Sequence, residues 1–137
     1  VAAAGDVLLG ALNGIFYTDA ATQKPTWANH LAASNTATDI VGFVSDDPYE
    51  RFEIQSNNTG ASLQTDVFMN YDIEYTAGSS PNFVSKVELN DSSTTTSSAQ
   101  LRIIGVSKDP SNNALASANT NFVVEIVEHF YKQAAGV

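Results

Sequence analysis

The chain has 137 residues, a net charge of −9 at pH 7 and no cysteine. This length predicts one domain with a single core. The acidic balance argues against direct binding of nucleic acid, because phosphates require Lys and Arg and the chain has only 6 of them. Without cysteine there is neither a disulfide framework nor a thiolate metal site, and no run approaches the roughly 18 apolar residues of a membrane span.

The first 34 residues predict a hairpin followed by a loop. Residues 6–10 and 14–17 are short apolar runs on either side of the turn-prone Leu12-Asn13-Gly14, which is the pattern of two paired strands. Residues 18–34 are polar and contain Pro25. We expect them to form a long loop that lays Trp27 on the body of the protein.

Two further strands are predicted before residue 56. Residues 39–44 are almost continuously apolar, as in a strand buried on both faces. Residues 51–55 alternate polar and apolar side chains, which is typical of a strand with one face in water. The acidic turn at Asp46-Asp47 predicts that the two strands form an antiparallel pair.

The second half of the chain alternates apolar runs with polar loops. Leu63, Val67 and Phe68 recur at helical spacing and predict one helical turn within residues 62–70. Residues 91–98 and 107–120 are polar and predict exposed loops. Four runs rich in β-branched or aromatic residues predict strands: residues 71–75, 84–89, 99–106 and 121–131.

These elements predict an all-β fold, an antiparallel β-sandwich or β-barrel of about eight short strands with long polar loops. The predicted strands do not alternate with helices, so the pattern is not that of a parallel sheet. We expect residues 1–137 to form a single β-rich domain, with residues 1–5 and 132–137 as flexible or partner-contacting tails. The opening residues lack the basic region of a signal peptide. From the start at Val1 we expect either a processed chain or a missing N-terminal arm.

The acidic residues near Pro48 have the chemistry of a cation site. Asp46, Asp47 and Glu50 supply the carboxylate oxygens that calcium prefers. Their spacing is not that of a calcium-binding loop, and an acidic turn between strands is the better interpretation. We therefore expect no metal.

No catalytic constellation emerges from the remaining ionisable residues. Glu125 and Glu128 fall on opposite faces of a regular strand, so they do not form the convergent pair of a glycoside hydrolase. His30 and His129 are the only histidines and form no local metal motif. We expect no catalytic site and no cofactor.

Several segments of the chain are similar to those of a known protein family. They are residues 16–20, 25–30, 42–48, 52–55 and 101–107. In order and spacing they resemble small structural proteins of tailed bacteriophages, the capsid decoration or cement proteins, and the resemblance extends from about Gly14 to Tyr131.

The resemblance implies a β-rich protein of the virion that binds the outer surface of an assembled capsid without chemistry. Its implied partners are the major capsid protein and other copies of itself, most often in a trimer, with neither nucleic acid nor membrane as a partner. It also implies a further N-terminal segment ahead of Val1. The candidate interface residues are the aromatics Trp27, Tyr49, Phe130 and Tyr131, because aromatic side chains are enriched at interfaces. Each has an alternative role as a half-buried core residue.

Two other classes remain as alternatives. A glycan-binding β-sandwich, an adhesin or carbohydrate-binding module, would show a row of exposed aromatics on one flat face. Most of the seven Phe lie within apolar runs, which favours the core. A β-barrel hydrolase or isomerase has the least support, because no nucleophile, base and orienting group can be named together.

Overall fold

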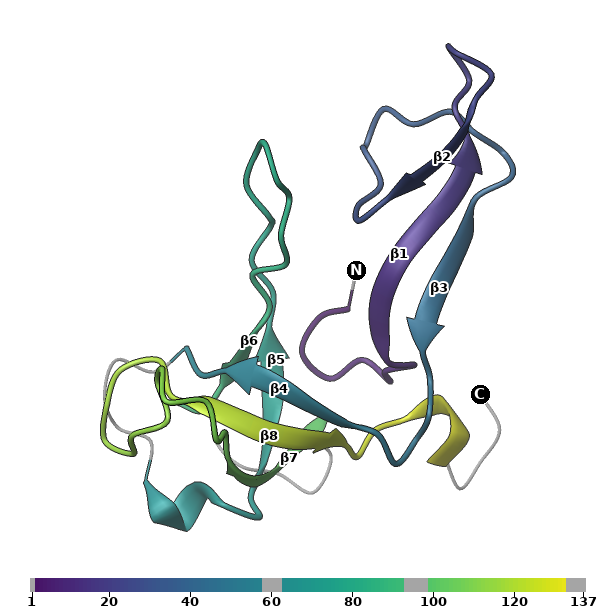
Figure 1. Ribbon diagram of the computed structural model, residues 1–137. Coiled ribbons are helices and arrows are strands. Elements are labelled where there is room, and N and C mark those ends of the chain that lie inside the picture. The colour runs from purple at the N-terminus through teal and green to yellow at the C-terminus, as the bar shows by residue number, and fades with distance from the viewer. Residues whose placement is uncertain (1, 58–62, 93–98, 133–137) are drawn as a thin grey trace.

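The structure is a computed structural model that describes residues 2–57, 63–92 and 99–132. These residues form eight strands in two antiparallel sheets and no α-helix, which confirms the all-β prediction. The larger sheet is curled into a half-barrel, and the smaller one stands away from it (Figure 1). We call residues 9–47, which contain the smaller sheet, the arm, and the other described residues the body.

The body is built on a sheet with the order β4-β8-β7-β5-β6. Its strands are β4 (Arg51–Gln55), β5 (Asn70–Glu74), β6 (Glu88–Asn90), β7 (Leu101–Val106) and β8 (Asn121–Ile126). Along β8, Phe122, Val124 and Ile126 are buried while the residues between them are half-buried. This period of two places the apolar residues on the concave side of the curled sheet.

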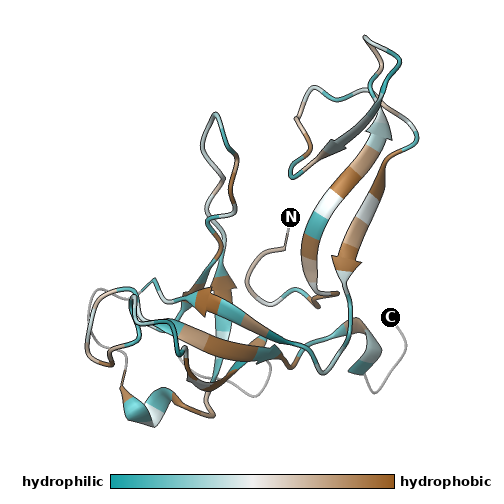
Figure 2. Ribbon diagram, viewed as in Figure 1, coloured by the Kyte–Doolittle hydropathy of each residue, from teal (hydrophilic) through white to brown (hydrophobic). Residues whose placement is uncertain are grey.

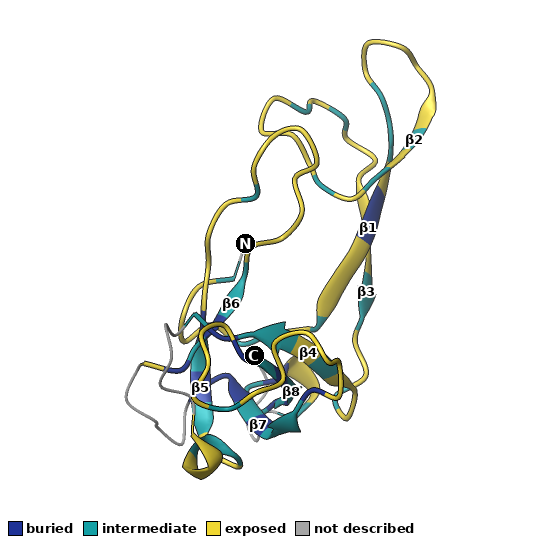
Figure 3. Ribbon diagram, turned by 60° about the vertical axis from the view of Figure 1, so that its left-hand side comes forward, coloured by how far each residue is buried: buried dark blue, intermediate teal, exposed yellow. Residues whose placement is uncertain are grey.

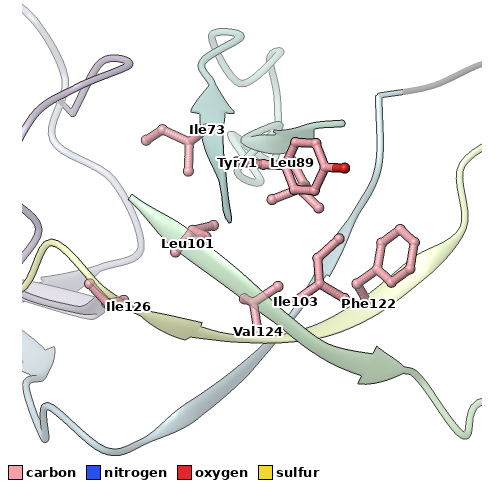
Figure 4. Close-up of a cluster of buried hydrophobic side chains, with 8 residues drawn as sticks. All are labelled: Tyr71, Ile73, Leu89, Leu101, Ile103, Phe122, Val124 and Ile126. Carbon is pink, nitrogen blue, oxygen red and sulfur yellow. The ribbon is translucent and has the colours of Figure 1, made fainter. Parts of the chain in front are cut away.

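One hydrophobic core fills the body (Figure 4). Leu89, Ile103 and Phe122 are completely buried and come from three different strands. Because this core closes without any residue of the arm strands, the body has the packing of a self-sufficient unit. Its eight buried apolar side chains are Tyr71, Ile73, Leu89, Leu101, Ile103, Phe122, Val124 and Ile126.

The N-terminal segment is tied to the body by the buried amide of Gln100. Its Nε2 donates to the carbonyl oxygens of Ala3 (2.9 Å) and Asp6 (2.7 Å). Its Oε1 accepts the N–H of Ile73 at 3.1 Å. Leu8 continues the attachment through a parallel bridge to His129. One fully buried side chain therefore joins residues 3–6 to β5.

The arm sheet has the order β2-β1-β3, with β1 at Ala11–Thr18, β2 at Pro25–Ala28 and β3 at Val41–Ser45. Both pairings are antiparallel, and the pairing of β1 with β3 shifts register between Leu12 and Gly14. The arm joins the body through residues 46–50, between β3 and β4.

A second contact between arm and body comes from the long loop that joins β5 to β6 and projects from the sheet (Figure 1). Asn29 Nδ2 donates to the carbonyl oxygen of Asn82 at 3.0 Å. Next to it, the rings of His30 and Phe83 stack with centroids 4.2 Å apart. These contacts brace the arm without burying its sheet.

Four expectations for the first half of the chain are wrong. Residues 6–17 do not form a hairpin, because residues 11–18 are one continuous strand whose partners are β2 and β3. Trp27 lies in β2 and not in a loop laid on the body. β3 is exposed or half-buried and not buried on both faces, and it does not pair with β4, which belongs to the other sheet. Their common cause is the separate arm, which local patterns do not reveal.

In the second half of the chain, the structure agrees more closely with the prediction from the sequence. The strands predicted at residues 51–55, 71–75 and 99–106 are confirmed as β4, β5 and β7. The predicted helical turn is a 3-10 turn, η1 (Gln64–Asp66), and the run at 84–89 yields only the short β6. The last strand ends at Ile126 and is followed by a second 3-10 turn, η2 (Phe130–Lys132). Most of the loop predicted at residues 91–98 lies outside the described residues.

Candidate interaction surface

One side of the arm sheet carries four large apolar side chains. In the register of the sheet, Phe16 lies opposite both Trp27 on β2 and Val41 on β3. Phe43 lies two residues beyond Val41 and therefore points to the same side. We call Phe16, Trp27, Val41 and Phe43 the apolar face. Figure 2 shows the apolar segments that β1 and β3 contribute to the arm.

The glycine at position 14 gives the indole ring its place on this face. A Cβ atom built on Gly14 would collide with the Trp27 ring. The ring also contacts Phe43, with centroids 5.0 Å apart and planes inclined by 48°. Trp27 therefore lies across β1 and reaches a side chain of β3, so that all three strands contribute to a continuous apolar surface.

The apolar face is exposed. Phe16, Trp27, Val41 and Phe43 retain 40%, 57%, 51% and 47% of their accessible surface, whereas Ile15 on the other side of the sheet retains 5%. Buried segments gather in the body, and the arm is largely exposed or half-buried (Figure 3). A sheet with an apolar face is stable when another layer covers that face. Within the described residues, no strand or helix supplies such a layer.

The four candidate aromatics from the sequence fall into two places. Trp27 lies on the apolar face. Tyr49 lies between β3 and β4, and Phe130 and Tyr131 lie in η2, where the arm meets the body. All four are exposed, Tyr49 most of all at 78%. The structure thus places three of the candidates close to the junction of arm and body and one on the arm.

Polar contacts link the two sides of this junction. The hydroxyl of Tyr131 donates to Asp46 Oδ2 at 3.1 Å. This hydrogen bond, together with the negative charge of Asp46, raises the pKa of the Tyr131 hydroxyl. Lys132 Nζ lies 5.0 Å from the centroid of the Tyr49 ring, a cation–π contact, and donates to the carbonyl oxygen of Ile126 at 2.9 Å. We call Asp46, Tyr49, Phe130, Tyr131 and Lys132 the junction cluster.

The sequence did not predict that Phe16, Val41 and Phe43 lie on the surface. Each lies in a run whose apolar character is the ordinary mark of a core strand. The available signal was the glycine at position 14, since a glycine inside a strand indicates close approach of another group. The sequence pattern instead predicts that Gly14 lies in a turn.

The ionisable groups considered for chemistry are dispersed. His30 stacks on Phe83 beside the arm, whereas His129 is buried in the body, where its Nδ1 accepts the N–H of Tyr131 at 3.1 Å. Asp47 Oδ1 accepts the N–H of Tyr49 at 2.9 Å. In the described ranges, no group of three or more His, Asp or Glu is arranged to hold a metal ion.

Two shallow hollows of about 280 and 210 Å³ lie on the surface, one along residues 79–86 and the other between residues 17–21 and 32–36. Each is lined by a single charged side chain, Lys86 in the first and Asp19 in the second. Of the helical turns in the described part of the chain, none has the length and apolar character needed to cross a membrane.

Comparison with protein-family models, with curated proteins and with solved structures gives no match for this chain. The function is therefore inferred from the residues and the geometry described above.

Proposed function

We propose that this protein is a viral structural protein that decorates the outer surface of a phage capsid. It would bind the lattice of the major capsid protein non-covalently, as a closed homo-oligomer with a trimer as the expected state, and stabilise the assembled shell. The observation that carries this proposal is the apolar face, an apolar side of a β-sheet that is left exposed beside a complete body core.

Contact with another protein is the simplest use for such a surface. Exposed apolar patches on soluble proteins mark interaction sites, and interface centres are enriched in Trp and Phe. The face has one Trp and two Phe. Because the arm stands away from the body (Figure 1), it can lie on a neighbouring subunit while the body keeps its own core.

Stabilisation of a shell needs binding and no turnover. A protein that binds only the assembled lattice stabilises the lattice by mass action. The body supplies a rigid support and the arm supplies the contact. The contacts of the junction cluster and the His30–Phe83 stack limit the directions in which the arm can point.

The decisive experiment compares binding to undecorated shells and to unassembled capsid subunits by co-sedimentation and by size-exclusion chromatography. We expect the protein to bind the shells and to bind the free subunits more weakly. Equal affinity for both, or binding to neither, contradicts the proposal. Light scattering on the purified protein measures whether it is a monomer or a trimer.

A glycan-binding role is the second candidate, and one observation favours it. Phe16, Trp27 and Phe43 form the row of exposed aromatics that a sugar-stacking surface requires. However, the planes of Trp27 and Phe43 are inclined by 48°, so the rings do not form a flat platform. The four side chains of the face also carry a single hydrogen-bonding group, the indole N–H. A glycan array with clear signals that disappear in the Trp27→Ala variant would favour this role.

A further inference from the structure

We infer that the apolar face docks on a different protein whose contact surface is apolar at its centre and basic at its two ends, and not on a second copy of this chain. This inference rests on the proposed function and specifies the partner surface for it. The charge at the two ends of the face and the size of the face support it.

Carboxylates lie at both ends of the sheet that bears the apolar face. β1 and β3 are antiparallel, so the end of β1 lies beside the start of β3. At that end, Asp19 follows β1, and Asp39 accepts the N–H of Thr18 through both carboxylate oxygens at 3.0 and 3.1 Å. At the other end, Asp46 and Asp47 follow β3 directly. β3 lies between the two pairs, and its five residues span about 17 Å at the rise per residue of a strand.

The carboxylates at the first end are held in the ionised state. Hydrogen bonds from Thr22 lower the pKa of Asp19, and hydrogen bonds from Thr18 lower the pKa of Asp39. Lys24 is the only Lys or Arg among residues 9–47, which contain four aspartates. The arm therefore has a net charge of −3 at pH 7, with its negative charges beside the apolar face and not within it.

A second copy fits this surface poorly. In a twofold contact the same patch meets itself, so the carboxylates of two acidic arms would be brought together. In a trimer the face would meet a different patch of a second copy, and each chain has a net charge of −9. The contact would also be small. Four side chains that are about half exposed offer roughly 400 Å² per copy, against about 800 Å² per partner in a stable interface.

A partner with Lys or Arg at the rim removes both difficulties. Attraction between the rim charges replaces repulsion, and the contact extends past the apolar face to the strand ends. In the proposed function this partner is a subunit of the shell. Homo-oligomers, where they form, would then use other surfaces of the chain.

The dependence of binding affinity on salt concentration distinguishes a basic partner from a second copy of this chain. Exposed charge pairs are screened by salt, so affinity for a basic rim falls as ionic strength rises. Association of two acidic arms shows the opposite trend, since salt screens their repulsion. The probe is a preparation of undecorated shells of the virus that encodes this chain, and co-sedimentation is measured from low to high salt.

Matched variants locate the contact. Val41→Ser changes the apolar face, and Val84→Ser changes an exposed valine of the β5–β6 loop, with 51% and 65% of their surfaces exposed. Asp47→Asn removes a charge at the end of the face. Asp109→Asn is its control, because Asp47 and Asp109 each accept a backbone N–H two residues on at 2.9 Å.

We expect Val41→Ser to weaken shell binding about tenfold, as for an interface residue worth more than ~1 kcal/mol, and Val84→Ser to bind normally. Asp47→Asn should bind about threefold more weakly at low salt, with the difference lost at high salt, and Asp109→Asn should not change. Circular dichroism and thermal melting check that each variant is folded.

Two results overturn the inference while the proposed function stands. One is shell binding that Val41→Ser leaves unchanged or that strengthens with salt. The other is a purified dimer or trimer that Val41→Ser converts to a monomer in light scattering. If the unmodified protein does not bind shells at all, the proposed function fails and the inference fails with it.

Discussion

The ring of Trp27 lies over the backbone of Gly14, where any β-carbon would collide with it. This relationship places the indole against β1, where it contacts Phe43 on β3. The glycine is thus a structural requirement of the apolar face, and its replacement tests how the face is built.

Gly14→Ala should displace Trp27 and loosen the arm while the body stays folded. Without a collision, Gly→Ala in a strand gains about 0.4–1 kcal/mol by restricting the unfolded chain, so a loss of stability in the arm points to the collision. Trp27 is the only tryptophan, and its fluorescence should shift to longer wavelength. Gly105→Ala in β7, where the added carbon meets nothing within 4 Å, is the control and should leave the spectrum unchanged.

The body core and the apolar face should respond differently to the same truncation. Val124 is 1% exposed and Val41 is 51% exposed. Val124→Ala should lower the free energy of unfolding by about 1.5–3 kcal/mol, because it removes two buried carbons and leaves a cavity. Val41→Ala should change it by less than about 0.5 kcal/mol. Urea denaturation measures both. Similar losses for the two variants would mean that the face is buried in the isolated protein.

Gln100 should control the attachment of the N-terminal segment. Gln100→Glu replaces the amide that donates to Ala3 and Asp6 with a group that cannot donate when ionised. The unpaired carbonyl groups and buried charge should cost about 1–3 kcal/mol. Hydrogen exchange of residues 2–8 should accelerate. Gln64→Glu at the exposed 3-10 turn η1 should behave like the unmodified protein, and equal exchange in both variants would argue against a tether.

The junction cluster makes a prediction about pH. The pKa of Tyr131 is raised because its hydroxyl donates to Asp46. A group with a raised folded-state pKa contributes stability that is complete below the pKa of the unfolded chain and is lost as pH rises through the folded value. The link between arm and body should therefore weaken in alkaline solution, above a pH of about 10.

Tyrosine NMR titration measures this pKa directly. Asp46→Asn removes the charge and should bring the pKa of Tyr131 down towards the ordinary tyrosine value. Asp47→Asn is the control, because Asp47 bonds the N–H of Tyr49 and not Tyr131, and it should leave the titration unchanged. A Tyr131 titration that is the same in all three proteins would refute the contact.

The sequence predicted the body well because its strands carry local signals that agree with their environment. In β8, apolar residues alternate with polar or half-buried ones, and the curled sheet buries one side of that pattern. The arm was mispredicted because its strands have the apolar character of core strands and lack a core. Val41 and Phe43 are exposed only because the chain leaves the arm sheet uncovered, which is a tertiary property that local patterns do not encode.

The sequence predicted only part of the candidate site, because local patterns do not encode contacts between strands. Trp27 was identified through its residue type, and the structure places it on the apolar face. Phe16 and Phe43 were assigned to the core, and only the register of β1 with β2 and β3 brings them to the same side as Trp27. The gathering of Tyr49 and Tyr131 at the junction depends on a contact between residues far apart in sequence, which composition cannot reveal.

In the proposed function, the apolar face of the arm is the contact surface for the capsid. Hydrogen–deuterium exchange of the protein, free and bound to undecorated shells, measures whether the arm is covered on binding. We predict that amides of β1, β2 and β3 become strongly protected on binding while those of β7 and β8 change little. Bound protein whose arm exchanges as fast as in solution would contradict the account.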